Sequence, residues 1–391
     1  MLDVVDLFKE QGTRDELGIG AIRDAFADLL FPGTGTVQTR ARYFLFVPWI
    51  YRDLEQRQVP SAKIASEARK VEVALIEALV RSHRGSREGV IGVEARAALR
   101  RLPSNIYWLG LATWKIRLTH GSQEQFHRAL DRYYRIVTPP RRRAEETDAP
   151  ATILPNWHTG LPDAPGSFPA KANFTLRRSE ADYLRERIMA SVPDSLLAFL
   201  VDQGREEDAA DYPWLHPQWR QFPAAIREQL EHGRNFSEAI HGAALLYNFL
   251  LAEKSAKKEL MKIYQADLKD WAESMSARAG ELTGWDRKRF WAIVSSNPNI
   301  RISTPTHHFV TSWLDLALSP AIADHIKSHD PARKLIQNRE ESLKGNLARL
   351  NNRDALRLWN GAAGTGRLDY RWRQAKTIVA DILAGQKGSH A

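Results

Sequence analysis

The sequence predicts a mostly α-helical, multi-helical protein with two helical domains joined by a proline-rich segment. Three observations carry this prediction. Apolar residues recur at helical spacing along most of the 391 residues, strand-like runs with hairpin signals are nearly absent, and prolines cluster in one stretch. Seven of the 19 prolines fall between residues 139 and 169. We therefore expect an N-terminal helical domain over residues 1–138, a linker over 139–175 and a C-terminal helical domain over 176–391.

Within the N-terminal domain, residues 40–51 are apolar nearly all round, which predicts a buried central helix kinked near Pro48. Residues 93–102 and 105–116 have the spacing of a helix-turn-helix motif, although the second segment is too apolar to suit a groove-reading helix. The further helices expected in this domain span residues 4–11, 19–30, 61–82 and 123–136.

The C-terminal domain shows the same periodicity after capping residues such as Ser179 and Asn235. A stretch rich in Leu, Ala, Glu and Lys predicts one long helix over residues 235–279. The other helices expected here span residues 180–190, 195–203, 285–295, 306–318, 333–350, 354–359 and 368–384.

Positive charge is concentrated in two blocks of the chain. The whole chain has 56 Lys and Arg against 47 Asp and Glu, a net charge of +9. Residues 81–143 carry +10, residues 327–376 carry +7, and the remainder is net negative. Segregated positive charge is typical of proteins that bind polyanions. Three interpretations stay open: nucleic acid, with DNA favoured, an acidic protein partner, or a solvated surface without a binding function.

The first block contains the strongest candidate for phosphate contacts. In the helix predicted over 123–136, Arg128, Arg132 and Arg135 share one face, while Phe126 and Leu130 share another. Three guanidinium groups on one stripe can follow a phosphate backbone. Earlier in the block, three further arginines complete the predicted nucleic-acid-binding set: Arg96, Arg100 and Arg101.

Other features of the sequence exclude several chemistries. The absence of cysteine removes disulfides, thiolate nucleophiles and cysteine metal sites, and it suits a cytoplasmic protein. No P-loop or nucleophile-elbow motif is present. Two Glu-x-x-His pairs, Glu124/His127 and Glu238/His241, have the spacing of di-iron ligands, but about one such pair is expected by chance and a di-iron site needs two further carboxylates. No metal and no cofactor are therefore expected. No apolar run approaches the length of a membrane span, and we expect no membrane partner.

An alternative function is a metal-independent helical ribonuclease. Such enzymes use an arginine to stabilise the phosphate and a histidine, separated from it by four to six intervening residues, as acid or base. Arg234 and His241 have this spacing, and they form the best of four such pairs in the chain. About as many pairs are expected by chance. The residues that follow His241 are apolar, which favours a structural role for this histidine.

Several segments resemble an uncharacterised bacterial family known by a domain-of-unknown-function label. They are residues 17–20, 31–34, 39–44, 48–49, 102–108, 235–236, 246–248 and 368–372. The resemblance implies a cytoplasmic subunit of a bacterial antiviral defence system that works with a helicase or a phospholipase-D-like nuclease. It transfers no functional residue, because the family's motifs carry no understood chemistry. The sequence therefore predicts a non-enzymatic nucleic-acid-binding or assembly subunit.

Overall fold

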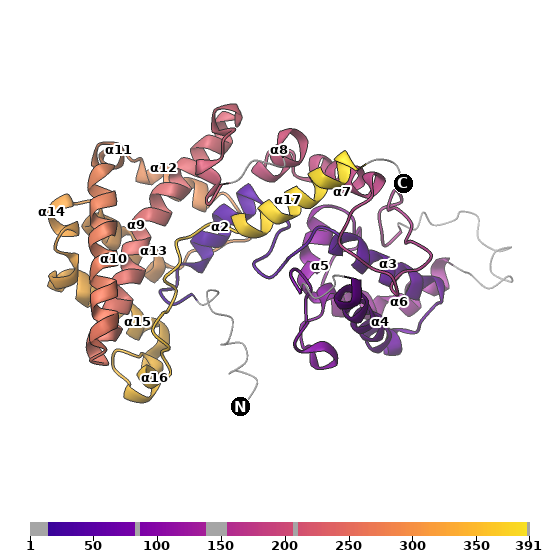
Figure 1. Cartoon of the computed structure of the whole chain (residues 1–391), viewed down its shortest axis with the longest axis horizontal. Coiled ribbons are helices and arrows are strands. Elements are labelled where there is room, and N and C mark those ends of the chain that lie inside the picture. Colours follow the sequence, from indigo (N-terminus) through magenta and orange to yellow (C-terminus); the bar gives the residue numbers. More distant parts are fainter. Residues whose placement is uncertain (1–14, 83–86, 138–154, 206–209, 389–391) are drawn as a thin grey trace. The chain divides into compact units, whose positions relative to one another are not determined.

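The computed structural model describes residues 15–82, 87–137, 155–205 and 210–388, and these form a mostly helical protein without strands (Figure 1). The described residues fold as two compact units that are interleaved along the chain. Unit 1 contains the residues up to Leu29, Tyr212–Leu215 and Pro223–Tyr370, and unit 2 contains the rest. The helical fold class is confirmed. The expected division at residues 139–175 stays a prediction, since 139–154 lie outside the described residues and 155–175 belong to unit 2.

Unit 1 is built around α9 (Ala224–Lys254), against which α10 (Lys258–Ala277) packs along its length (Figure 1). Two tryptophans, Trp271 and Trp313, donate their indole N–H groups to α9 carbonyls at 2.8 Å, which satisfies donors that would otherwise be buried unpaired. The remaining elements of this unit are α2 (Gly20–Leu30), η2 (Pro213–Leu215), α11 (Ala279–Thr283), α12 (Arg287–Val294), α13 (Thr304–Ala317), α14 (Pro320–Ala323), η4 (Ile326–Ser328), α15 (Asp330–Lys344), η5 (Gly345–Leu347) and α16 (Arg353–Arg357).

Unit 2 is built around α3 (Tyr43–Gln56), whose residues from Tyr43 to Tyr51 are all buried, as predicted for a central helix. The ring of Phe44 stacks on that of Trp114 with 3.8 Å between centroids. The other elements of this unit are α4 (Ser61–Ser82), η1 (Arg96–Ala98), α5 (Pro103–Thr113), α6 (Gln123–Val137), α7 (Arg178–Ser191), α8 (Leu196–Gln203), η3 (Trp219–Gln221) and α17 (Trp372–Lys387).

The chain leaves unit 1 for the last time between Tyr370 and Arg371, and both residues have positive φ, at 55° and 68°. Non-glycine residues rarely adopt this conformation, so surrounding contacts must hold it. The Tyr370 hydroxyl donates to the carbonyl of Gly233 at 2.6 Å within unit 1, and the Arg371 guanidinium donates to the carbonyl of Thr34 at 2.9 Å within unit 2.

Two helix predictions are wrong, and one lies outside the described residues. Residues 93–102 form only the short η1 and turns, so the helix-turn-helix interpretation fails. Arg96 has a φ of 43°, which interrupts a right-handed helix within this segment. The helical stretch predicted over 235–279 begins earlier, at Ala224, and is two helices, α9 and α10, separated at Ala256, whose φ is 54°. The helix predicted over 4–11 precedes the described part of the chain.

Candidate nucleic-acid interface

Helix α6 separates its side chains as its sequence predicts. Phe126 and Leu130 are buried, whereas Arg128, Arg132 and Arg135 are exposed. At 1.5 Å per residue, the Cα atoms of Arg128 and Arg135 lie about 10 Å apart along the helix axis. We call these three residues the arginine stripe. Its spacing matches a short run of phosphates, which the stripe can contact without any rearrangement of the helix.

The face of α6 opposite to solvent is anchored at several points. The His127 ring and the Tyr51 hydroxyl share a hydrogen bond of 2.9 Å. Asp131 accepts a hydrogen bond from the backbone N–H of Ser61 at 2.8 Å, and its own N–H donates to the Ser61 hydroxyl at 3.0 Å. The amide of Gln123 donates to the Tyr51 hydroxyl at 2.6 Å. The arginine stripe therefore stands on a helix that α3 and α4 hold in place.

The arginine stripe has weak internal partners. Arg128 forms an exposed ion pair with Glu124, and the Nε of Arg135 donates to the carbonyl of Asp131 at 3.3 Å. Exposed ion pairs contribute about 0–1 kcal/mol, so a phosphate can compete with Glu124 for Arg128. Glu124 and Asp131 lower the net charge of α6, an effect that the spacing of the arginines alone does not show.

The other three predicted phosphate contacts lie near η1 rather than on a helix face. Both carboxylate oxygens of Glu77, on α4, lie 2.8 Å from an Nη of Arg96. Arg100 and Arg101 follow on an exposed turn before α5. These three residues come from a backbone segment without a helical repeat, so they form no regular stripe of their own.

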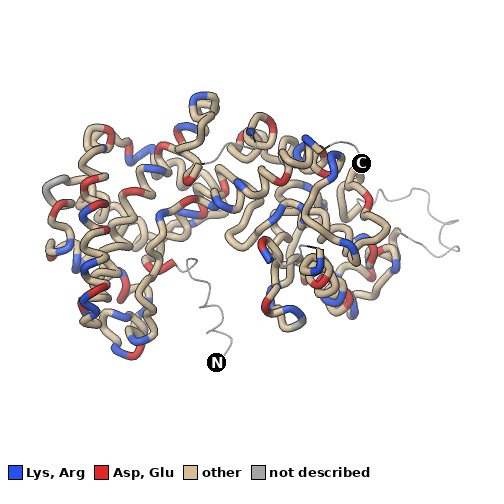
Figure 2. Tube along the Cα trace, viewed as in Figure 1, with Lys and Arg blue, Asp and Glu red and all other residues tan. Residues whose placement is uncertain are grey.

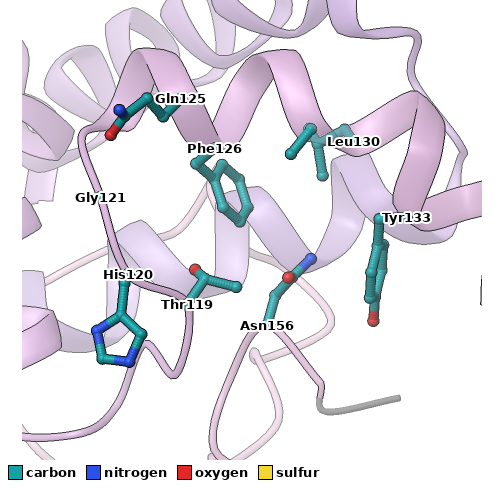
Figure 3. Close-up of a pocket in the computed structure, with 9 residues that line it drawn as sticks. Thr119, His120, Gly121, Gln125, Phe126, Leu130, Tyr133 and Asn156 are labelled. Carbon is teal, nitrogen blue, oxygen red and sulfur yellow. The ribbon is translucent and has the colours of Figure 1, made fainter.

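A pocket of about 550 Å³ lies against α6, on the side of Phe126 and Leu130, and the sequence did not predict it (Figure 3). One wall is α6 itself, and the other comes from residues 119–121 and Asn156. An isolated antiparallel bridge between Arg117 and Trp157 brings these two chain segments together, with Leu118 N–H donating to the Asn156 carbonyl at 2.8 Å. The lining residues are Thr119, His120, Gly121, Gln125, Phe126, Ala129, Leu130, Tyr133 and Asn156.

A buried cation stands behind the pocket wall. Arg117 is 4% exposed, lies 4.5 Å above the Trp108 ring, and donates to the carbonyl of Thr119, which lines the pocket. Burial lowers the pKa of Arg117, and among the described residues no carboxylate forms an ion pair with it. Because Arg pKa values exceed about 12, the group stays charged. The wall therefore carries a positive charge that a nearby anion can balance.

One carboxyl group lies close to this region without lining the pocket. Glu55 accepts a hydrogen bond from the Trp157 indole at 2.7 Å, and burial raises the pKa of Glu55 to about 7. Burial also raises the pKa of Tyr133, and the charge of Glu55 adds to that rise. Near neutral pH, Glu55 is therefore only partly ionised and offsets the nearby cations incompletely.

Some cations of the second basic block have internal partners. Arg339 donates to the carbonyls of Leu17 and Gly18 at 2.8 and 3.0 Å. Lys344 and Arg349 both pair with Glu16, at 2.6 and 3.0 Å. Lys334, Arg353 and Arg357 are exposed. Figure 2 shows basic and acidic positions interspersed within each unit. The charge of residues 327–376 is therefore divided between internal contacts and the surface.

The proposed catalytic pair of the ribonuclease hypothesis takes part in separate internal contacts. Arg234 pairs with Glu238 at 3.1 Å, and Arg278 and Arg367 pair with the same carboxylate. The Nε2 of His241 lies 3.0 Å from the carbonyl of Thr365. Since a carbonyl only accepts, Nε2 must carry the proton. His241 therefore holds the loop that follows α16.

We expect the ring of His241 to stay neutral between pH 5.5 and 8. Burial lowers its pKa to about 4, so protonation is disfavoured in the folded protein. Its contribution to stability is present above pH 6.5 and is lost as the pH falls towards 4. Side-chain NMR of histidine-labelled protein measures this titration. A midpoint near 6.5 would contradict the structural role and revive His241 as an acid or base.

Neither Glu-x-x-His pair forms a metal site. His127 faces Tyr51, and Glu238 is surrounded by arginines. Among residues 15–388, outside the undescribed gaps, no cluster of three His, Cys, Asp or Glu side chains could hold a metal ion. No helix in the described segments is long and apolar enough to cross a membrane.

Comparison with known proteins identifies one matching family, which is defined by its sequence. The chain belongs to DUF6361, a family of unknown function, whose model matches residues 2–385. No curated protein and no solved structure matches it. The family supplies no catalytic or binding residues, so any function must be argued from the residues of this chain.

Proposed function

We propose that this protein is a non-enzymatic nucleic-acid-binding subunit that contacts phosphates through α6, with DNA as the favoured ligand. The observation that carries the proposal is the arginine stripe, three exposed guanidinium groups on one face of an anchored helix. Arg101, exposed before α5, and Arg100 extend the candidate surface in the same unit. The second basic block is left out of the proposal, because several of its cations, among them Arg339, Lys344 and Arg349, have internal partners.

The assembly part of the proposal follows from the resemblance described above. It makes the protein a cytoplasmic subunit of a bacterial antiviral defence system, acting with a helicase or a phospholipase-D-like nuclease. In that arrangement the arginine stripe would hold nucleic acid while the partner supplies the chemistry. The inward-facing contacts of Arg234 and His241 support a binding role over the ribonuclease alternative.

A salt titration of binding tests this proposal. Fluorescence anisotropy with labelled 12-nucleotide DNA, single-stranded and duplex, gives the affinity at 50 to 300 mM NaCl. Three phosphate contacts predict a log–log slope of about −2.7 on duplex DNA or −2.1 on a single strand. Absence of binding to both probes at 50 mM NaCl would overturn the proposal, as would affinity that does not change with salt.

A further inference from the structure

We propose that the pocket against α6 receives an unpaired base, so that the protein binds single-stranded DNA in preference to duplex. The inference rests on the proposed function and names its substrate class. It extends the proposed function, because the arginine stripe alone would accept the phosphates of single-stranded and of duplex DNA. The pocket supplies what a phosphate-binding helix lacks, a place for a base outside a helical stack.

The size and walls of the pocket suit a flat heterocycle. Its volume of about 550 Å³ lies within the range of roughly 300–1,000 Å³ found for small-molecule sites. Phe126, Ala129 and Leu130 give an apolar wall, and the half-buried ring of Tyr133 stands at one end (Figure 3). Proteins that bind single strands place bases against aromatic rings in this manner.

The remaining lining residues can hydrogen-bond to the edge of a base. Thr119 and Asn156, on the wall opposite α6, carry both donors and acceptors (Figure 3). Gln125, on α6, keeps its amide N–H groups as donors, since its oxygen accepts from the N–H of Ser122 at 2.8 Å. The Thr119 hydroxyl is buried and has no hydrogen-bond partner within the described residues. A buried hydroxyl without a partner costs free energy, which a bound polar group would recover.

Charge around the pocket favours a ligand that carries phosphate. Its lining contains no acidic residue, and the buried Arg117 stands directly behind Thr119. At about 100° per residue, Arg128 and Arg132 lie next to the stripe of Gln125 and Ala129 that borders the pocket. Arg132 is the member of the arginine stripe nearest to the pocket border, so a strand with one base in the pocket can present a neighbouring phosphate to it, whereas Arg135 lies on the opposite face of α6.

A DNA duplex cannot place a base in the pocket and its phosphates on the arginine stripe without distortion. Its bases are paired and stacked, and turning one outward costs a few kcal/mol. A single strand has unstacked bases at much lower cost, so the pocket discriminates between the two forms. The arginine stripe would then supply affinity and the pocket would supply the preference for an unpaired strand.

The test compares the full-length protein with a variant whose pocket is filled, Ala129→Trp. Ala129 is exposed at the pocket wall, so a larger side chain blocks the space without altering any charge. The matched control is Ala65→Trp, the same change at an exposed position of α4 that does not line the pocket. A second variant, Tyr133→Ala, removes the ring at the end of the pocket.

We expect wild-type protein and the Ala65 control to bind a 12-nucleotide oligo(dT) at least ten times more tightly than a duplex of equal length. Ala129→Trp should lose about ten- to a hundredfold in single-strand affinity, in the range measured for loss of one base stack, and keep its duplex affinity. Tyr133→Ala, like Ala129→Trp, should lower the single-strand affinity and keep the duplex affinity. Circular dichroism and the duplex affinity itself show that each variant is folded.

Two results would overturn the inference in distinguishable ways. Equal affinity of the wild type for both probes, unchanged in Ala129→Trp, would remove the pocket from binding and leave the arginine stripe in place. Absence of binding to either probe would overturn the inference together with the proposed function. A single-strand preference that survives in both pocket variants would also contradict the pocket as its source.

Discussion

Replacement of Arg128, Arg132 and Arg135 with glutamate is expected to abolish nucleic-acid binding, with a loss of at least about a hundredfold in affinity at 50 mM NaCl. Each substitution removes one phosphate contact and adds a repelling charge, and each lost contact lowers the salt slope by about 1. The variant should remain folded, because the anchors of α6 are its other side chains, among them Phe126 and Leu130. Anisotropy with the same DNA probes measures the loss.

The control for this variant is a second triple reversal with the same change in net charge. Lys258, Lys262 and Lys269 are exposed on α10, in the other unit, so their replacement with glutamate alters the total charge by the same six units. We expect the α10 variant to keep most of the wild-type affinity. An equal loss in both variants would show that overall charge, and not the arginine stripe, governs binding.

Much of the helical layout could be predicted because local signals agree with tertiary packing. The helix over 61–82 has the predicted bounds, and α6 differs by one residue at its end. Both segments have a clear apolar stripe bordered by polar residues, so periodicity and burial give the same answer. The two predicted capping residues are wrong, because Ser179 lies inside α7, whose N-cap is Arg177, and Asn235 lies inside α9.

The break between α9 and α10 could not be predicted because no sequence signal marks it. Residues 255–257 contain neither glycine nor proline, and all three are ordinary in a helix. The left-handed turn is made by Ala256, a residue that seldom adopts positive φ. Tertiary packing of α10 against α9 overrides the local preference, and single-sequence periodicity contains no information about that packing.

The pocket could not be predicted for a different reason. Its walls come from α6, from residues 119–121 and from Asn156. The bridge between Arg117 and Trp157 holds residues 119–121 next to Asn156. Each segment by itself has an ordinary composition. Only the pairing of segments about 40 residues apart creates the cavity, and non-local pairing of this kind leaves no periodic trace in the sequence.

The charge count could not separate cations that face solvent from cations that face the core. Arg132 and Arg339 contribute equally to a net charge, although the first is exposed and the second is 5% exposed with backbone carbonyls as acceptors. A block of positive charge in the sequence is thus evidence for a polyanion site only after burial is known. That distinction removes Arg339, Lys344 and Arg349 from the candidate binding surface and keeps the exposed arginines of α6.

Replacement of Glu340 tests whether the internal cations of the second block have a structural role, because its carboxylate lies at the centre of their contacts. It is fully buried and accepts from the Tyr247 hydroxyl at 2.5 Å and from the N–H groups of Arg349 and Leu350 at 3.0 Å, and Lys344 lies 3.2 Å away. Replacement with alanine leaves these donors without an acceptor. We expect Glu340→Ala to lower the free energy of unfolding by about 3–5 kcal/mol.

The neighbouring exposed carboxylate provides the matched control: Glu341→Ala should change stability by less than about 0.5 kcal/mol. Urea unfolding followed by circular dichroism measures both variants. If the internal cations of the second block are structural, Glu340→Ala must lower stability while its folded fraction, assayed at low temperature, binds DNA with wild-type affinity and salt slope. A stability loss below about 1 kcal/mol, or a weaker salt slope in the folded variant, would return Lys344 and Arg349 to the candidate binding surface, since cations held firmly by Glu16 and Glu340 cannot also neutralise phosphates.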